Sequence, residues 1–283
     1  MTAKDTMDNR LVSSALANGR YLLYLDLLGF SNLVETREPE DIYAVIDSAL
    51  QSFYRWEELN QQFKTIYFSD TFLFYQEHKG YGDWAFLDVY AIGAMLLSAL
   101  LAQQIPARGA ITFGEIEIRE DSKRKHQIYY GKALIEAYRA EKKEQWIGIV
   151  IQPSAWIPYE TSNKGLIEIF EQEKVWKRRD DAVLLLNPFI KLRAWYEDDL
   201  IGEIDRPYME WDKPAFPNDL LGFRFLHAQA NNYARRDDFS GREAIKYHNT
   251  IAFLRDVLGK DMYEWAMKIS MLESDAQNDQ LNN

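Results

Sequence analysis

Six segments between residues 21 and 113 constrain the fold of this chain more than any other feature of its sequence. Runs of strand length alternate with apolar residues at helical spacing, in the order strand, helix, two strands, helix, strand. The segments are Tyr21 to Leu28, a helix opening at Pro39, Phe63 to Phe68, Thr71 to Tyr75, Asp83 to Gln103 and Arg108 to Phe113. This order predicts an α+β fold with a ferredoxin-like βαββαβ core.

Further elements are expected after this core. We expect strands at 114–119, 127–130 and 146–152, and a charged amphipathic helix at 132–145. The second half predicts a helix near Ser154, strands at 175–177 and 182–186, an irregular loop at 207–217, and helices at 242–258 and 260–272. The chain then divides into an N-terminal segment (1–19), a core (20–152) and a C-terminal α/β extension (153–283) packed on the core.

Composition excludes several classes of protein. The formal charge is −11, with 33 basic against 44 acidic residues, so extended binding of nucleic acid is not expected. The chain has no cysteine, which excludes disulfides and thiolate-bound zinc and favours a cytoplasmic setting. The apolar stretch from Ala91 to Ala102 is too short to span a bilayer, so we expect a buried helix and no membrane segment.

Two aspartates are expected to meet at one corner of the sheet. The first two strands of a βαββαβ core run parallel, so their carboxyl ends lie at the same edge. Asp26 lies near the end of the first strand, and Asp70 lies in the hairpin turn that ends the second. Carboxylate oxygens are the ligands that Mg²⁺ prefers, commonly one or two carboxylates together with substrate phosphates. The pair therefore predicts a divalent metal site.

A plainer interpretation exists for each aspartate alone. Asp26 could cap a turn, and Asp70 could form an Asx-turn within the hairpin. Gly29 follows Asp26 closely, however, and begins a turn in which the backbone can approach a phosphate. Asp70 lies in an otherwise apolar hairpin, where a carboxylate needs a cation or hydrogen bonds. The metal interpretation is favoured by the two residues together.

Four short motifs in order resemble those of class III nucleotidyl cyclases. Asp26-Leu27-Leu28-Gly29-Phe30-Ser31 resembles the first metal motif, and Ser69-Asp70 resembles the second, in which glycine usually precedes the aspartate. Ala107-Arg108-Gly109-Ala110-Ile111 resembles the Arg-x-Gly-Ile strand, and Gly131 to Arg139 takes the place of the Gly-x-x-Val-Asn-x-x-x-Arg segment. The resemblance covers about Tyr21 to Gln152, roughly half of the chain.

The resemblance implies a metal-dependent enzyme that converts a nucleoside triphosphate into a cyclic nucleotide. Two Mn²⁺ or Mg²⁺ ions would be held by Asp26, Asp70 and the carbonyl of Leu27, with Gly29, Phe30 and Ser31 beside the substrate. Arg139 matches the arginine that stabilises the transition state, and it would come from the other chain of a head-to-tail homodimer. Ile135 stands where the family carries asparagine. A basic cluster, Lys174 with Lys177, Arg178 and Arg179, lies near the place of a phosphate-binding lysine, although most such charge runs are simply solvated.

The positions that read the base in purine cyclases are occupied here by Ile66 and Ile128, which cannot form hydrogen bonds to a purine edge. The motifs are most similar to the bacterial pyrimidine cyclases of Pycsar antiphage defence. That similarity implies UTP as substrate and cyclic UMP as a messenger acting on a separate effector, or CTP and cyclic CMP. Candidate base-reading residues are Lys64, Thr65, Tyr67 and Tyr130.

Three other functions occur on the same type of core. A catalytically silent dimer of the same fold could bind a nucleotide and signal by association; Ile135 favours this, whereas the presence of both Asp26 and Asp70 argues against it. A diguanylate-synthase-like nucleotidyltransferase shares the core, but it would need a Gly-Gly-Asp/Glu-Glu-Phe hairpin in place of Tyr67-Phe-Ser-Asp-Thr71. A ferredoxin-like interaction domain would bind no divalent ion.

Overall fold

The computed structural model describes residues 17–59, 63–80, 82–121, 126–193, 196, 218–234 and 241–281. The strands are β1 (Arg20–Leu27), β2 (Phe63–Phe68), β3 (Thr71–Gln76), β4 (Ala107–Gly114), β5 (Glu117–Asp121), β6 (His126–Tyr130), β7 (Gly148–Ile151), β8 (Trp176–Arg178) and β9 (Leu184–Leu186). The helices are α2 (Phe30–Thr36), α3 (Pro39–Leu59), α4 (Asp83–Ala102), α5 (Lys132–Lys143), α6 (Pro153–Ser162), α7 (Leu166–Gln172), α10 (Asn218–Ala234) and α11 (Arg242–Leu281). The expected loop at 207–217 lies outside the described residues.

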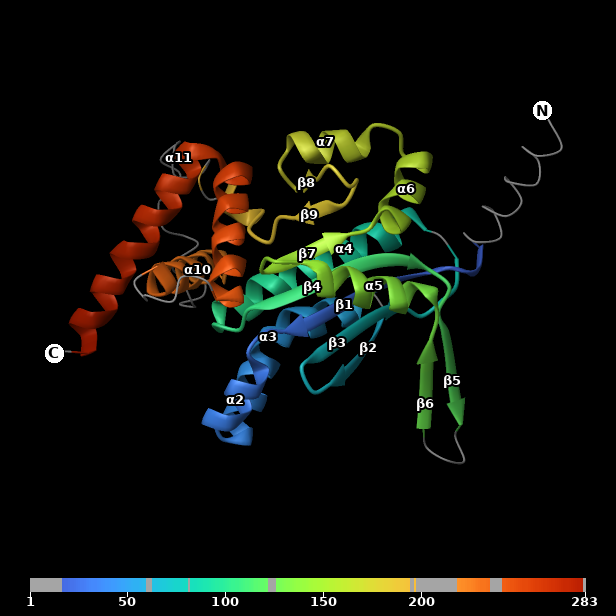
Figure 1. The fold of residues 1–283 in the computed structure, drawn as a ribbon, viewed down its shortest axis with the longest axis horizontal. Helices are drawn as coiled ribbons and strands as arrows, with labels where there is room; N and C mark the ends of the chain where they lie inside the picture. Colours follow the sequence, from blue (N-terminus) through green and yellow to red (C-terminus); the bar gives the residue numbers. More distant parts are fainter. Residues whose placement is uncertain are drawn as a thin grey trace.

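A seven-stranded sheet runs through the molecule in the order β2-β3-β1-β4-β7-β9-β8 (Figure 1). Strand β4 pairs with β7 in parallel, and the other neighbours pair antiparallel. The first four strands have the ferredoxin-like order, and β1 and β2 run parallel because each is antiparallel to β3. The predicted α+β fold is confirmed. Strands β5 and β6 form a separate hairpin that projects from the body (Figure 1).

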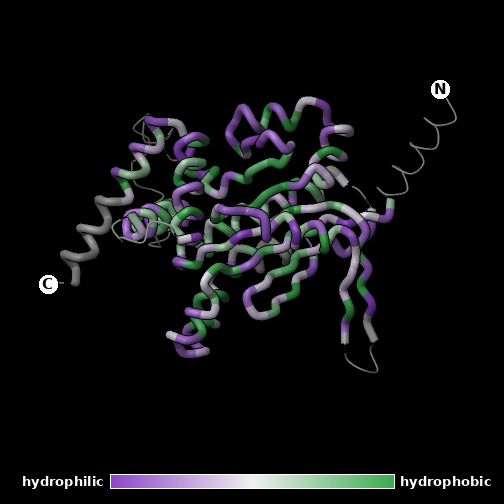
Figure 2. Tube along the Cα trace, in the orientation of Figure 1, coloured by the Kyte–Doolittle hydropathy of each residue, from purple (hydrophilic) through white to green (hydrophobic). Residues whose placement is uncertain are grey.

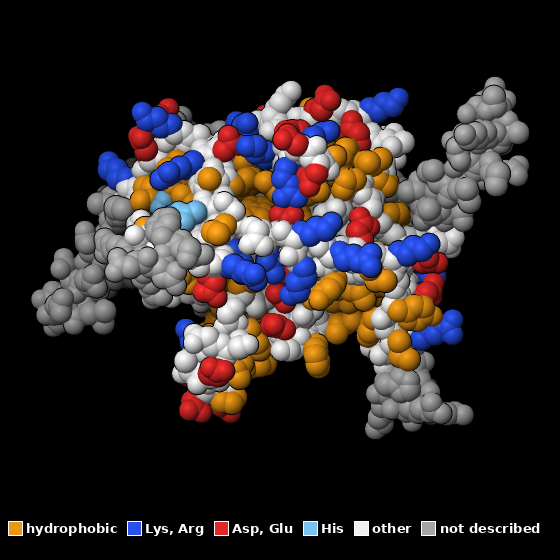
Figure 3. All heavy atoms as spheres, in the orientation of Figure 1, with side chains coloured by type: hydrophobic (Ala, Val, Ile, Leu, Met, Phe, Trp, Pro, Cys, Tyr) orange, Lys and Arg blue, Asp and Glu red, His pale blue; other side chains and the backbone are white. Residues whose placement is uncertain are grey.

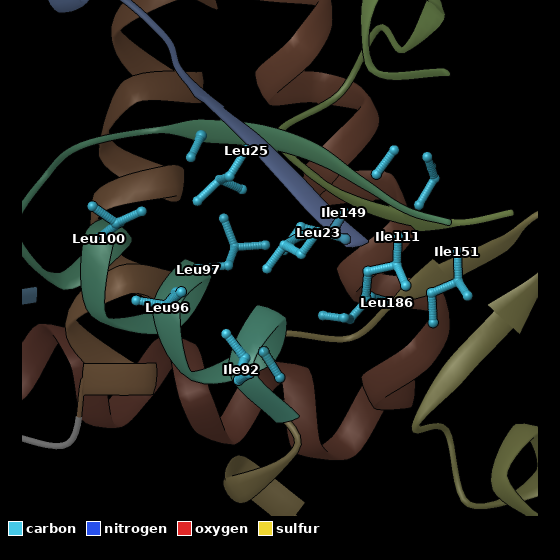
Figure 4. Close-up of a cluster of buried hydrophobic side chains, with 14 of the residues drawn as sticks. Leu23, Leu25, Ile92, Leu96, Leu97, Leu100, Ile111, Ile149, Ile151 and Leu186 are labelled. Carbon is cyan, nitrogen blue, oxygen red and sulfur yellow. The ribbon is translucent and has the colours of Figure 1, made fainter. Parts of the chain in front are cut away.

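The two faces of the sheet are covered by different helices. Side chains alternate along a strand, so Leu23 and Leu25 point to one face of β1, whereas Tyr24 and Asp26 point to the other. Figure 4 shows Leu23 and Leu25 together with Ile111, against the leucines of α4. On the opposite face the ring of Tyr24 meets that of Tyr138 on α5. Hydrophobic residues are concentrated in the central strands (Figure 2).

Helix α4 is apolar on all sides because it is enclosed. It packs on the sheet with one side and on α10 with another. Within the described part of the chain it is the one helix long and apolar enough to cross a membrane (Trp84–Ala102), yet 67% of that window is buried inside the protein. The expectation of a buried helix here is confirmed.

The C-terminal extension continues the core sheet through β8 and β9 and adds α10 and α11. Helix α10 was not predicted from the sequence. It lies between α4 and α11, so its apolar residues are spread around the helix and form no clear amphipathic stripe. The two helices expected near the end of the chain are confirmed: α11 is divided at Gly259, whose backbone is not helical (φ 72°). The second of them continues to Leu281, nine residues beyond its expected end at 272.

Helix α10 carries a buried acid where it meets α4. The Asp219 carboxylate accepts a hydrogen bond from the Ser98 hydroxyl, and its Oδ2 has no partner. Burial raises the pKa of Asp219 to about 6. The folded protein therefore binds this proton more tightly than the unfolded chain does, and the contribution of Asp219 to stability falls as pH rises from about 4 to about 6.

We expect Asp219→Asn to remove this part of the pH dependence. The wild type should lose about 2 kcal/mol more unfolding free energy than the variant between pH 4 and pH 7. Urea denaturation at several pH values measures the difference. The exposed Asp261→Asn on α11 is the matched control and should follow the wild-type curve. Parallel curves for wild type and Asp219→Asn would contradict the assignment.

Candidate active site

The end of β1 is joined directly to the β2–β3 turn. The amide of Leu27 donates a hydrogen bond to the carbonyl of Asp70, with an N···O distance of 2.8 Å, and Asp26 lies opposite Thr71 in the ladder. The predicted meeting of Asp26 and Asp70 at one edge of the sheet is thus present. The two carboxylates are near enough for the charge of Asp70 to act on the pKa of Asp26.

The turn that carries Asp70 has an unusual backbone. Ser69 has a φ of 56°, in the left-handed region that glycine adopts more easily. The resembled motif has glycine at this position, and glycine would adopt the same φ with less strain. After β1, Gly29 has a φ of 75° and precedes Phe30 and Ser31, the first residues of α2.

Asp26 is nearly buried, with 9% of its surface exposed. Its Oδ2 lies 3.7 Å from Lys142 Nζ of α5. Burial raises the pKa of Asp26; Lys142 and Arg108 oppose the rise, and Asp70 adds to it. A carboxylate in such a place gains from a cation beside it, because burial has removed much of its hydration.

A buried ion pair lies next to Asp26. Arg108 faces Asp26 across the β1–β4 ladder, and its Nε donates to Glu141 Oε1 at 2.6 Å. Its NH1 also donates to the carbonyl of Glu144 at 2.8 Å. Burial raises the pKa of Glu141, against the attraction of Arg108. Sequence reasoning assigned no role to Lys142 and suggested only a solvated position for Glu141, which is in fact fully buried. Helical spacing alone does not show which side of α5 faces β1.

The donor atoms at this edge suit a hard divalent ion that shares its coordination with a ligand. No three His, Cys, Asp or Glu side chains cluster as a metal site in the part of the chain that the structure describes. Mg²⁺ commonly binds one or two carboxylates and fills its other coordination positions with water and phosphate oxygens. Asp26 and Asp70 therefore fit a metal that is bound together with its substrate.

Arg139 lies elsewhere in the same chain. It lines an open cavity of about 510 Å³ on the side of α5 toward β9, which Asp26 and Asp70 do not line. The cavity is bordered by Lys132, Ile135, Glu136, Arg139, Ala140, Lys143, Glu144, Gln152, Arg179, Asp181 and Val183. Arg179, a member of the predicted basic cluster, donates two hydrogen bonds to Glu144, of 2.8 and 2.9 Å.

The two candidate phosphate-binding lysines do not line this cavity. Lys177 pairs with Asp256 of α11 at 2.7 Å. The backbone carbonyl of Lys174 accepts a hydrogen bond from Asn187. Within one chain, the basic residues placed beside Arg139 are Lys132, Lys143 and Arg179, and the role of Lys174 and Lys177 stays a prediction.

The candidate base-reading residues are divided between two faces of the sheet. Ile66 pairs with Leu73, which pairs with Tyr24, so Ile66 shares the face of Asp26. Lys64 lies on the same face and pairs with Glu77 at 3.7 Å. Tyr67 points to the opposite face, where its ring lies 5.0 Å from that of Phe72, and Thr65 shares that face. Tyr130 ends β6 and is 44% exposed.

No protein-family model and no curated protein sequence matches this chain. Several solved structures resemble part of it. The adenylyl cyclase CyaB from P. aeruginosa is 13% identical, with a TM-score of 0.46 over 60% of this chain and 94% of that one. The guanylyl cyclase Cya2 is 18% identical, with a TM-score of 0.42 over 50% and 78%. The guanylate cyclase domain of RhGC from Catenaria anguillulae, in complex with GTP, is 11% identical, with a TM-score of 0.45 over 60% and 94%. Such partial matches concern the arrangement of helices and strands only.

The strain at Ser69 can be tested. We expect Ser69→Gly to raise the free energy of unfolding by about 0.5 kcal/mol, since relief of a left-handed conformation is partly offset by the greater backbone entropy that glycine loses. Denaturant unfolding measures the change. Ser69→Ala keeps the strain and should not stabilise the protein. Destabilisation by glycine would show that the serine side chain supports the turn.

Proposed function

We propose that this protein is a nucleotide cyclase that converts a ribonucleoside triphosphate into its 3′,5′-cyclic monophosphate and pyrophosphate. The observation that carries the proposal is the meeting of Asp26 and Asp70 at the end of β1, through the hydrogen bond between Leu27 and Asp70. The ferredoxin-like strand order and the four cyclase-like motifs support it. The cyclase structures that resemble part of the chain have the same general arrangement of elements.

In this proposal Asp26, Asp70 and the Leu27 carbonyl would hold divalent ions, Mn²⁺ or Mg²⁺. Such ions, when bound, neutralise the triphosphate and lower the pKa of the attacking hydroxyl. The Asp26 and Asp70 carboxylates fix where the triphosphate lies, with Gly29, Phe30 and Ser31 beside it. The ribose 3′-oxygen then bonds to the α-phosphorus while the bond to pyrophosphate breaks. Arg139 stabilises the negative charge that develops at the phosphorus.

The site requires two chains, in our proposal a head-to-tail homodimer. Arg139 lines a cavity separate from Asp26 and Asp70, so a partner chain is needed to bring the three together. Exposed apolar side chains support such a contact: Phe68 is 80% exposed and Tyr138 is 49% exposed. Figure 3 shows hydrophobic side chains over β2 and β3, next to Lys and Arg side chains over α5. Burial of apolar surface beside the site would stabilise the dimer.

The proposed substrate is UTP, and the product would be a messenger in Pycsar-type antiphage defence. Ile66 lies on the face of the sheet that carries Asp26, where a purine-reading hydrogen-bond partner would be needed. Its apolar side chain disfavours purine recognition of the usual kind. The similarity of the motifs to pyrimidine cyclases supports UTP, with CTP as the alternative. Ile135, at the place of a family asparagine, favours the second candidate function, a silent nucleotide-binding dimer.

The reaction is tested by incubation with each of the four ribonucleoside triphosphates and Mn²⁺ or Mg²⁺, with products identified by mass spectrometry. We expect cyclic UMP from the wild type and a loss of turnover of at least about 100-fold in Asp70→Asn, because the amide is a weaker ligand for a hard cation. The variant should remain a folded dimer. A cyclic purine would overturn the substrate; no product from a folded dimer would favour the silent dimer.

The shared site is tested by mixing two inactive variants. Asp70→Asn retains Arg139, and Arg139→Ala retains Asp70, so a mixed dimer contains one complete site. We expect each variant alone to be inactive and an equimolar exchanged mixture to recover about a quarter of the wild-type rate. Asp70→Asn mixed with Asp26→Asn is the control, which restores no site. No recovery in the first mixture, with exchange of chains demonstrated, would contradict a site made by two chains.

A further inference from the structure

Lys142 lies where a cation would approach Asp26. Its Nζ is 3.7 Å from Asp26 Oδ2 and 3.5 Å from Glu141 Oε2. The same ammonium group lies 5.7 Å from the ring centroid of Tyr138. The side chain of Lys142 is 46% exposed, whereas those of Asp26 and Glu141 are 12% and 0% exposed. The lysine therefore covers the two carboxylates from the solvent side.

The neighbouring arginine differs from this lysine in its freedom to move. Arg108 is buried and donates hydrogen bonds to the Glu141 carboxylate and to the carbonyl of Glu144. Lys142 makes two ion pairs at 3.5–3.7 Å, at the end of a flexible four-carbon stem that reaches solvent. Lys142 can therefore leave Asp26 without breaking a buried hydrogen-bond network, whereas Arg108 cannot.

The charges at this edge explain why a resident cation is present. Asp26 is near enough to feel the charges of both Asp70 and Glu141, and Arg108 is paired with Glu141. Without Lys142, the nearly buried Asp26 would face Asp70 with only Arg108, which is paired with Glu141, and Lys246 to compensate its charge. A divalent ion supplies the same compensation with twice the charge. The ammonium and the ion therefore compete for one carboxylate.

We propose that Lys142 is a built-in counter-ion that occupies Asp26 in the metal-free protein and swings aside when a divalent ion binds. The inference rests on the metal site in the proposed function and adds a regulation of that site. Lys142 therefore sets the concentration of divalent ion at which the Asp26 carboxylate exchanges its ion pair with the lysine for binding to the metal. It makes the metal-free pair of aspartates stable at the cost of weaker metal binding.

The C-terminal extension reinforces this arrangement. Lys246 of α11 is near enough for its charge to act on Asp26, Glu141 and Arg108, and burial lowers its pKa. Helix α11 is fixed there by Thr250, whose hydroxyl accepts a hydrogen bond from the Ile147 amide at 2.8 Å. Lys246 therefore adds positive charge from a fixed element, and Lys142 is the mobile cation.

The test measures Mn²⁺ binding directly, by the electron paramagnetic resonance signal of free Mn²⁺, without substrate and independently of turnover. We expect Lys142→Met to lower the dissociation constant on the order of tenfold, because a repelling unit charge beside a divalent ion is removed. Lys142→Gln, which keeps a polar end, should act in the same direction. Melting without metal shows that both variants are folded.

Lys143→Met is the matched control. Lys143 is the next residue in the same last turn of α5, has the same charge, and lines the Arg139 cavity. It should leave the dissociation constant within about twofold of wild type, since its charge is farther from the carboxylates and is screened by solvent. An equal gain from Lys143→Met would show a diffuse charge effect and overturn a specific role for Lys142.

The remaining outcomes separate this inference from the proposed function. Mn²⁺ binding by wild type that Asp70→Asn abolishes, with no tighter binding by Lys142→Met, would overturn the inference and leave the metal site standing. Weaker binding by Lys142→Met would overturn it too, since the lysine would then position Asp26 for the ion. Absence of Mn²⁺ binding by wild type and by both Lys142 variants would overturn the metal site and the inference together.

Discussion

Strand β1 carries hydrogen bonds on both sides, and the rest of the structure depends on this position. It pairs with β3 along one edge and with β4 along the other. The next two amides after Asp26, those of Leu27 and Leu28, donate to the carbonyls of Asp70 and Pro106. Leu23 and Leu25 bind the strand to α4 on one face. The other face is then free to bring Tyr24 and Asp26 under α5. A buried strand with one apolar and one functional face thus fixes where the carboxylates lie.

The electrostatics at the end of β1 follow from that burial. A nearly buried aspartate beside a second carboxylate is poorly solvated, and the fold compensates it with Arg108, Lys142 and Lys246 from three different elements. Helix α5 separates this cluster from the cavity of Arg139, so its two sides serve different purposes. One side completes the environment of Asp26 within the chain. The other side carries the basic residues that border the open cavity of Arg139.

Much of the fold could be predicted because it is encoded by local periodicity. The strands that become β1 to β4, and helices α3 and α4, were identified from the alternation of apolar runs, and their order implied the neighbour relations in the sheet. Helix α10 was missed because a helix enclosed on several sides has no amphipathic stripe. The position of Arg179 beside Arg139 was not predicted, because it follows from the place of β8 and β9 in the sheet, which no short motif encodes.

The sequence by itself determined the pairing of Asp26 with Asp70, since two parallel strands must end at the same edge. It also determined that α4 is buried, because its composition leaves no polar face. Only the tertiary structure decided that Lys142 pairs with Asp26 and that Glu141 pairs with Arg108. It also decided that Arg139 lines a cavity that Asp26 and Asp70 do not line. Those relations depend on how α5 is rotated and placed over β1 and β4. Packing across the whole sheet fixes that placement, and local spacing does not.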